Sequence, residues 1–300
     1  MNKIKYLVVL VIGLLSLAGC GEGKVDISEA EYEPKIVVDA YIYPGKKVEL
    51  VYITRNVPLD KNFDLSKVLL TDANARITDL TDGKIYMLEY NPSKLSYEYN
   101  GSDLAIQNGK SYKLEVEATI DGKNLRTSSV TTVPLNGFNI NKLDPEVMKY
   151  RLTDENDIVK KINVSFSPAA NAEIYGISIT ALNPTIKNFI YDNAYHSDLD
   201  TNDVIEDFDS YKQQMYWLQN SKNDATQLDI DVEWHAIWFY TDYRVIIYAG
   251  DKNFKDFLLT HKNVQEMDGN FHEPKLHLEG DGIGVFASAI PDTVYFRIIK

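Results

Sequence analysis

The sequence predicts a mostly β protein with two β-sandwich domains of the immunoglobulin or fibronectin type III kind. Short runs rich in β-branched and aromatic residues recur along the 300-residue chain, as expected of strands. The turn pairs Pro44-Gly45, Asp82-Gly83 and Asp121-Gly122 separate neighbouring runs, which favours hairpins. Several runs also alternate apolar with polar residues, the pattern of a sheet with one buried and one solvated face.

The first domain is expected over residues 35–135. It opens with the runs KIVVDAYI and KVELVYITR, and ARITDLTDGKIYMLEY holds two further runs around a hairpin turn. In SYKLEVEATI, the side chains of Tyr112, Leu114 and Val116 lie on one face, while the other face is mostly charged. About seven short strands in about 100 residues, ending at Pro134, are typical of an immunoglobulin-like sandwich.

The second domain is expected over residues 136–300, with KINVSFSP and EIYGISITAL as paired strands. A long polar and acidic insertion follows at about 183–224. Strands are then expected in QLDIDVEWHAIWFY, YRVIIYAG, GIGVFASA and DTVYFRII. Between the second and third of these, DKNFKDFLLTHKN has the apolar spacing of a short helix, and Asp251 can cap its first turn.

Residues 1–19 have the order of a bacterial lipoprotein signal peptide. Lys3 and Lys5 precede an apolar run that is shorter than the roughly 20 residues needed to cross a bilayer. Leu17-Ala18-Gly19-Cys20 then resembles a lipobox, in which diacylglycerol is linked to the cysteine thiol and the new amino terminus is acylated. We therefore expect Cys20, the only cysteine, to begin the mature protein and to anchor it through several acyl chains.

The segment after the cysteine indicates a cellular address. Gly21 stands where an acidic residue would favour inner-membrane retention, so we expect the cell outer membrane, on either its periplasmic or its cell-surface side. Residues 20–34 are polar, acidic and end in Pro34, which is typical of a tether.

The composition excludes several classes of function. A net charge of −13 disfavours nucleic acid as a partner, because phosphate recognition needs a basic surface. It also disfavours electrostatic attachment to an anionic membrane and leaves the lipid as the anchor. With no second cysteine, the mature chain has neither a disulfide nor a free thiol for catalysis.

Specific motifs stand at both ends of the mature chain. Near the carboxyl end are Phe271, Glu273-Pro274, Gly282, Gly284, Val285 and Phe286. At the amino end, EPKIVVDAYI follows the lipobox and tether. In these features the chain resembles the Bacteroidota outer-membrane lipoproteins of domain-of-unknown-function family 4249.

The chain also departs from the family pattern, because Leu278-Glu279 replaces a frequent Asn-Ile pair and the insertion has no counterpart. Family members are often encoded beside TonB-dependent transporters, so the resemblance implies an accessory role in nutrient uptake. It implies no catalytic residues. The glycines near 282 precede a strand, which favours a bulge or close backbone contact over a phosphate loop.

A calcium site is one candidate within the insertion. Asp198, Asp200 and Asn202 occupy positions 1, 3 and 5 of an EF-hand-like loop, where alternating oxygens can surround one Ca²⁺. Asp203 replaces the usual glycine at position 6, and Asp209 replaces the bidentate glutamate at position 12. The alternative is a solvated acidic loop without a metal. Apart from this ion and the lipid on Cys20, we expect no cofactor.

Aromatic residues give the second candidate. Trp217, Tyr216 and Tyr211 lie in the polar insertion, so they are candidates for contact with a sugar, a peptide or a partner protein. Trp234 and Trp238 are expected on one face of a strand, where core packing is the simpler interpretation.

Catalytic motifs are missing from the sequence. His272 and His277 are five residues apart with a proline between them, which does not fit the helical zinc motif. We therefore expect a non-catalytic outer-membrane accessory protein that binds a nutrient or docks on a TonB-dependent transporter. The alternatives are a structural or adhesive cell-surface lipoprotein without a small-molecule ligand and, third, a hydrolase on a β scaffold.

Overall fold

The computed structural model describes residues 32–58, 64–195, 199–219, 225–261 and 274–300, and residues 34–300 form one compact unit. The signal peptide, Cys20 and most of the tether lie outside the described residues. Within those described ranges, no helix has the length and apolar character needed to cross a membrane.

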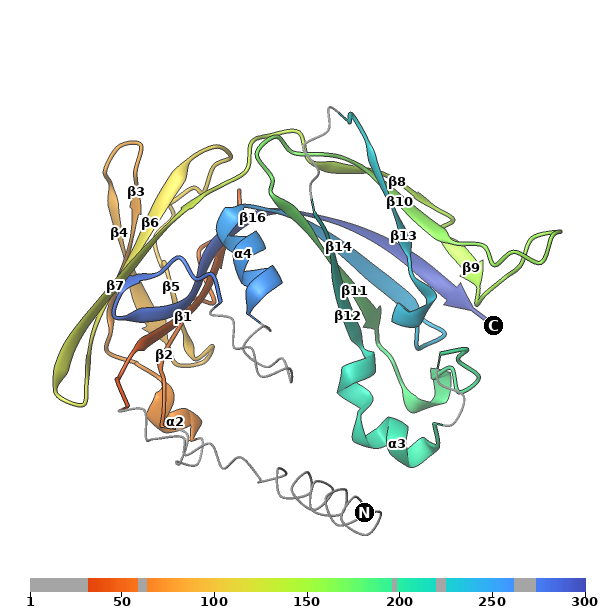
Figure 1. Cartoon of the computed structure of the whole chain (residues 1–300), viewed down its shortest axis with the longest axis horizontal. Coiled ribbons are helices and arrows are strands. Elements are labelled where there is room, and N and C mark those ends of the chain that lie inside the picture. The colour runs from red at the N-terminus through yellow and green to blue at the C-terminus, as the bar shows by residue number, and fades with distance from the viewer. Residues whose placement is uncertain (1–31, 59–63, 196–198, 220–224, 262–273) are drawn as a thin grey trace, which may run out of the picture. The chain divides into compact units, whose positions relative to one another are not determined.

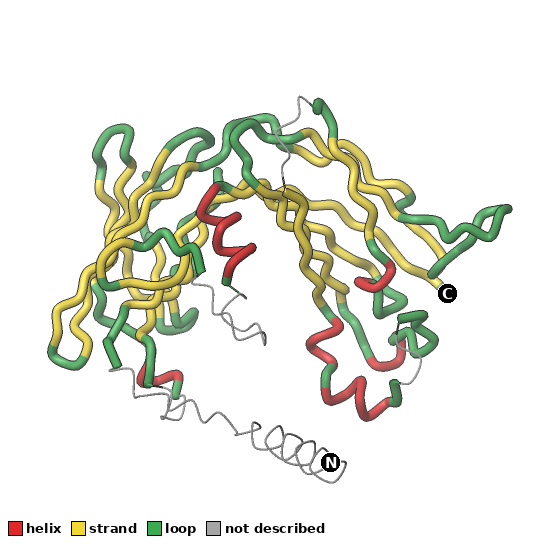
Figure 2. Tube along the Cα trace, in the orientation of Figure 1, coloured by secondary structure: helices red, strands yellow, loops and turns green. Residues whose placement is uncertain are grey.

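Strands account for most of the regular structure, as Figures 1 and 2 show, so the mostly β prediction is confirmed. The strands are β1 (Ile36–Ile42), β2 (Tyr52–Arg55), β3 (Asn74–Asp79), β4 (Ile85–Asn91), β5 (Ser96–Glu98), β6 (Ser111–Ile120), β7 (Lys123–Thr132), β8 (Asn139–Asp144), β9 (Val147–Lys149), β10 (Ile162–Ser167), β11 (Ile174–Leu182), β12 (Gln213–Gln219), β13 (Leu228–Val232), β14 (Asp242–Gly250), β15 (Glu279–Gly280) and β16 (Gly282–Ile299). The short helices are α2 (Leu65–Val68), η1 (Ile186–Asn188), α3 (Thr201–Glu206), η2 (Phe208–Tyr211), η3 (Trp234–Ala236) and α4 (Lys252–Thr260).

The first sandwich packs a six-stranded sheet against β1, β2 and the start of β16. The six-stranded sheet has the order β15-β7-β6-β3-β4-β5. Alternation places Tyr112, Leu114 and Val116 of β6 in the core, as the sequence predicts. Ile36 and Val38 of β1 reach the same core from the opposite layer.

The second sandwich packs the three-stranded sheet β13-β10-β8 against β12, β11, β14 and the end of β16. Its core includes Phe166 from the small sheet and Tyr175, Ile177 and Tyr243 from the large one. Apolar side chains from two sheets thus fill the space between them, which is the sandwich arrangement.

One continuous sheet forms a layer of both sandwiches. Residues 282–288 of β16 pair in parallel with β1, and residues 289–297 pair antiparallel with β14. The sheet order is therefore β12-β11-β14-β16-β1-β2, with β9 beside the end of β16. The first core includes Val133 and the second includes Phe138, but the carboxyl-terminal strand contributes Phe286 to the first core.

Both covering sheets lie on the same side of this continuous sheet. Phe286 of β16 enters the first core, and Phe296 and Ile298 enter the second. All three positions have the same parity along the strand, so their side chains point to one face. Odd-numbered residues such as Val285 and Ala287 point to the other face, where α4 packs.

Two local expectations for the second domain are wrong. The expected strand in 227–240 ends at Val232 and is followed by the short helix η3, so Trp234 and Trp238 do not share a strand face. Both tryptophans are nevertheless buried in the core. The expected insertion also contains a strand, β12, which forms the edge of the large sheet. The short helix α4 and its cap by Asp251 are confirmed.

The glycine-rich segment allows β15 and β16 to approach their neighbours closely. Gly284 has a φ of 112°, and a Cβ at this position would overlap the Val38 carbonyl of β1. Gly280 has a φ of 83° and faces the Arg126 carbonyl of β7 in the same way. The expected structural role of these glycines is confirmed, because only glycine tolerates both the backbone angle and the contact.

Candidate functional site

Strand β1 presents a polar and aromatic face opposite its buried one. Ile36, Val38, Ala40 and Ile42 are buried in the first core. Because side chains alternate along a strand, Asp39 and Tyr41 point to the face that the covering sheets leave open, and Tyr43 continues this row just beyond the strand end.

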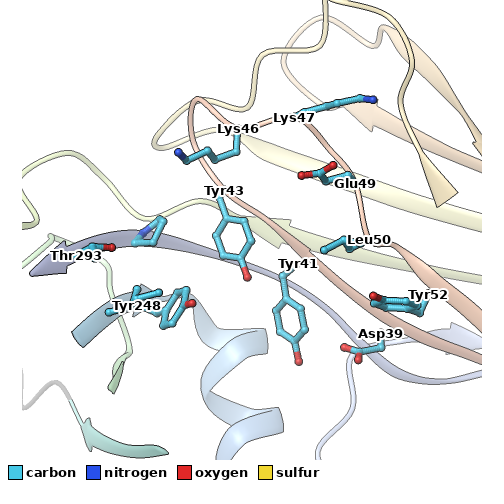
Figure 3. A pocket seen from close by; sticks show the side chains of 12 residues that line it. Asp39, Tyr41, Tyr43, Lys46, Lys47, Glu49, Leu50, Tyr52, Tyr248 and Thr293 are labelled. Atoms are coloured by element: carbon cyan, nitrogen blue, oxygen red, sulfur yellow. The ribbon is translucent and has the colours of Figure 1, made fainter. Parts of the chain in front are cut away.

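A pocket of about 460 Å³ opens over this face (Figure 3). The lining residues come from β1, β2 and the segment between them, and from β14 and β16. They are four tyrosines, four charged residues, three apolar residues and one threonine. These residues are Tyr41, Tyr43, Tyr52 and Tyr248, then Asp39, Lys46, Lys47 and Glu49, then Leu50, Ile246, Pro291 and Thr293. Tyr52 stands directly opposite Asp39 in the antiparallel register of β1 and β2.

Helix α4 supports the tyrosines through Phe254. The Phe254 ring lies 5.9 Å from the Tyr41 ring, edge to face, and 6.3 Å from the Tyr248 ring. Tyr248 in turn lies 6.1 Å from Tyr43 at an angle of 42°. These are the distances and tilts that aromatic pairs favour. Gly250 makes room for this arrangement, because a side chain there would collide with Phe254.

Buried polar contacts fix α4 to β7 and β16. The Asp251 carboxylate accepts hydrogen bonds from the Phe254 backbone N–H at 2.9 Å and from the Thr131 hydroxyl at 2.6 Å. The Asn253 side-chain amide donates to the carbonyls of Val130 and Phe286 at 2.8 and 2.9 Å. Burial raises the pKa of Asp251, and these hydrogen bonds offset part of that effect. These contacts hold α4 in place behind the tyrosines that Phe254 supports.

The Tyr41 and Tyr43 hydroxyls are protonated hydrogen-bonding groups at neutral pH. Burial raises the pKa of Tyr41 and of Tyr43 well above the ordinary value of 10.0, and the negative charge of Asp39 acts in the same direction. Partial desolvation also raises the pKa of Asp39, while an interaction with the Tyr41 hydroxyl lowers it in part. The pocket thus offers phenol donors beside a carboxylate.

Two of the four charged groups at the pocket are already engaged. Lys47 pairs with Glu98 at 3.5 Å, and Glu49 pairs with Lys94 at 2.7 Å. Asp39 and Lys46 have no ion-pair partner among the residues that the structure describes. The pocket therefore holds one uncommitted anion and one uncommitted cation.

The three aromatic candidates from the sequence do not form one surface. Tyr211 lies 4.7 Å from the Trp238 ring, and Tyr216 donates its hydroxyl to the Asp231 carbonyl at 3.2 Å, so both pack on the second core. Burial raises the pKa of Tyr216. Trp217, the next residue on β12, is 45% exposed on the opposite face. It remains the one candidate that is available for contact.

The structure gives the proposed calcium residues other local roles. Asp200 caps α3 by accepting hydrogen bonds from the backbone N–H groups of Asn202 and Asp203, and Asp209 pairs with Lys212. Asp198 lies outside the described residues. In the described part of the chain, no three His, Cys, Asp or Glu side chains are grouped as metal ligands. Calcium binding here stays a prediction.

The family model described as Domain of unknown function (DUF4249) matches residues 22–288. The chain belongs to this family. The match includes Gly280 of β15 and Gly284 of β16, and it includes Asp39, Tyr41, Tyr43 and Tyr248 of the pocket. Comparison with curated proteins gives no significant match.

Solved structures resemble this DUF4249 chain only distantly. They include a tetra-tandem repeat from a large adhesion protein (11% identity, TM-score 0.22, 88% of this chain and 48% of the other) and a 1.5-MDa bacterial ice-binding adhesin (11%, 0.22, 89% and 64%). The chicken interferon gamma receptor alpha chain is also similar (8%, 0.20, 72% and 87%). This chain thus spans about half of the adhesion-protein structure.

Proposed function

We propose that this protein is a lipid-anchored, non-catalytic binding protein of the outer membrane, and that the tyrosine pocket takes up a small nutrient. The observation that carries the proposal is the pocket of about 460 Å³, in which Tyr41, Tyr43, Tyr52 and Tyr248 converge. Ligand sites are typically concave, mostly apolar and equipped with a few placed polar groups. Tyrosine supplies both properties from one side chain.

Membrane attachment through Cys20 supports this role. The order of basic residues, apolar run and lipobox indicates export and lipidation. Diacylglycerol and an amino-terminal acyl chain would hold the protein at the outer membrane, with residues 20–34 as the tether. A binding protein held at this surface can concentrate a solute for a transporter.

Titration calorimetry with the purified mature chain tests the ligand site. Candidate nutrients are single amino acids, short peptides and sugars. A ligand of the pocket should lose at least about tenfold in affinity with Tyr43→Ala or Tyr248→Ala. Tyr295→Ala is the matched control, because Tyr295 is 58% exposed on β16 and does not line the pocket. Equal loss in all three variants, or in none, would argue against the site.

Docking on a TonB-dependent transporter is a second part of the proposal, favoured by the edge strand β12. Its sequence QQMYWLQ has no charge, and Met215 is 52% exposed beside Trp217. Natural edge strands usually carry charges or proline that prevent pairing with another chain. An uncharged edge is suited to pairing with a strand of a partner.

A pull-down from detergent-solubilised membranes tests this docking. The wild-type chain should co-purify a TonB-dependent barrel, and Met215→Lys with Trp217→Lys should abolish co-purification, because edge lysines oppose strand pairing. Recovery of the barrel with the Tyr43→Ala variant would show that docking and ligand binding use different surfaces. If no barrel co-purifies with any variant, a structural or adhesive role is the better account.

A further inference from the structure

The two uncommitted charges lie at opposite ends of the row of tyrosines. Figure 3 shows the side chains of Lys46, Tyr43, Tyr41 and Asp39 following one another along the pocket. Lys47 and Glu49, which also line the pocket, are paired with Glu98 and Lys94. The pocket is therefore complementary to an elongated molecule with a positive group at one end and a negative group at the other.

The Asp39 end has the properties of an ammonium site. Its carboxylate lies beside Tyr41, two residues along the same face, and opposite Tyr52 on the neighbouring strand. Phenol rings attract cations to their faces, and an adjoining carboxylate strengthens this attraction. Asp39 has no ion-pair partner among the described residues, and a carboxylate that accepts one hydrogen bond from Tyr41 can still accept others from a ligand's amino group.

The distance between the ends sets the size of the ligand. Tyr43 lies four positions beyond Asp39, which corresponds to about 13 Å at the rise of a strand, and the Lys46 backbone N–H donates to the Tyr43 carbonyl at 3.2 Å, so Lys46 stands beside Tyr43. A single amino acid is too short to reach both ends. An extended peptide advances about 3.3–3.6 Å per residue, so about four residues fill the interval.

We propose that the pocket binds short peptides of about four residues with free termini, the amino group at Asp39 and the carboxylate at Lys46. This proposal rests on the proposed function, because it names the ligand class of the same pocket.

Main-chain pairing with β1 is not available to the peptide, because β1 already pairs with β16 on one side and β2 on the other. The peptide therefore lies across the face and is held by its ends. Its inner side chains pack on Tyr41 and Tyr43, where apolar and aromatic side chains of several kinds fit. Recognition of the termini combined with tolerance of the inner sequence is suited to peptide uptake.

Calorimetry with the tetrapeptide Ala-Phe-Phe-Ala tests the proposal. The free peptide should bind the mature chain, and N-acetylation should weaken binding about tenfold, as should C-amidation. In Asp39→Asn, N-acetylation should cost nothing further, while C-amidation should still weaken binding. In Lys46→Gln, C-amidation should cost nothing further, while N-acetylation should still weaken binding. Circular dichroism of both variants checks that they fold as the wild type does.

Three results would overturn the peptide assignment. The first is equal affinity for the free peptide and for the peptide that is both N-acetylated and C-amidated. The second is a loss of affinity on each modification that is the same in Asp39→Asn and in Lys46→Gln as in the wild type. The third is binding of the neutral sugar maltotetraose, abolished by Tyr43→Ala, while the peptide does not bind. In this third case the proposed ligand site stands and only the ligand class is wrong. If neither probe nor any other nutrient binds, the proposed function itself fails.

Discussion

Phe286 and Phe296 lie ten residues apart on the same strand, yet each is buried in a different core. Both side chains point to the same face of β16, and the covering sheet changes between them. The strand therefore couples the two sandwiches, and a loss of packing in either core should lower the stability of the other.

Phe286→Ala tests this joining. Removal of a buried phenylalanine costs about 3–5 kcal/mol, and we expect the loss to destabilise both sandwiches. All three tryptophans, at 217, 234 and 238, belong to the second sandwich, so tryptophan fluorescence reports its unfolding alone. The urea midpoint from fluorescence should fall in Phe286→Ala and in Phe296→Ala. A fluorescence midpoint that stays at the wild-type value in Phe286→Ala would mean that the sandwiches unfold independently.

Gly284→Ala should destabilise the protein more than another glycine substitution at positive φ. Gly83 has a φ of 74° with no atom within 4 Å of an added Cβ, so Gly83→Ala should cost only about 1 kcal/mol of backbone strain. Gly284→Ala adds a collision with the Val38 carbonyl, and we expect a loss of at least about 3 kcal/mol in the free energy of unfolding. Thermal or urea unfolding measures both; equal losses would contradict the close contact.

Glu98→Gln should show a pH-dependent loss of stability. Hydrogen bonds from Lys94 and Asn91, at 2.8 and 3.0 Å, lower the pKa of Glu98 from 4.5 to about 2. A lowered pKa means that the folded state favours the ionised form, so its contribution is present above about pH 4.5 and is lost as the pH falls toward 2.

The urea midpoint of Glu98→Gln should therefore lie below that of the wild type at pH 7 and approach it near pH 3. Glu155→Gln, an exposed substitution that removes the same charge, should change little at either pH. A wild-type advantage that is as large near pH 3 as at pH 7 would show that Glu98 does not act through its ionised form.

Cys20→Ser should release the protein from membranes. Serine cannot form the thioether to diacylglycerol, so the variant should lack lipid and partition into the aqueous phase of a detergent phase separation. Mass spectrometry of the amino-terminal peptide from the wild type should show Cys20 carrying diacylglycerol and one acyl chain. A wild-type amino terminus without lipid would contradict the expected anchor.

Local patterns predict much of this fold because they depend on neighbours in sequence. The alternation in SYKLEVEATI gives β6 and its buried face, and Asp251 with the following apolar spacing gives α4. The edge strand β12 also alternates, with Met215 and Trp217 exposed and Tyr216 and Leu218 partly buried. The polar residues around it in the sequence hide this signal. An edge strand also has fewer contacts that would enforce a clear pattern.

Long-range pairing is what local patterns could not supply. The partner of Val38 is Gly284, and no spacing rule connects residues so far apart. The pocket depends on this pairing, since it brings Tyr41 of β1 beside Tyr248 of β14 and Pro291 of β16. The segment DAYIY does carry one signal of the pocket. Here β1 has an acid and tyrosines opposite its apolar face, whereas the face of β6 opposite its apolar side chains is mostly charged, as expected of a solvated surface.

The parallel pairing of β1 with β16 has a consequence for the order of events during synthesis. The ribosome delivers the chain from its amino end, so β1 emerges well before residues 282–288. Until then the first core lacks Phe286, and β1 has an unpaired edge open to wrong partners. The first sandwich therefore cannot be completed until residues 282–288 have been delivered, and a chaperone that covers the open edge of β1 would be most useful during that interval.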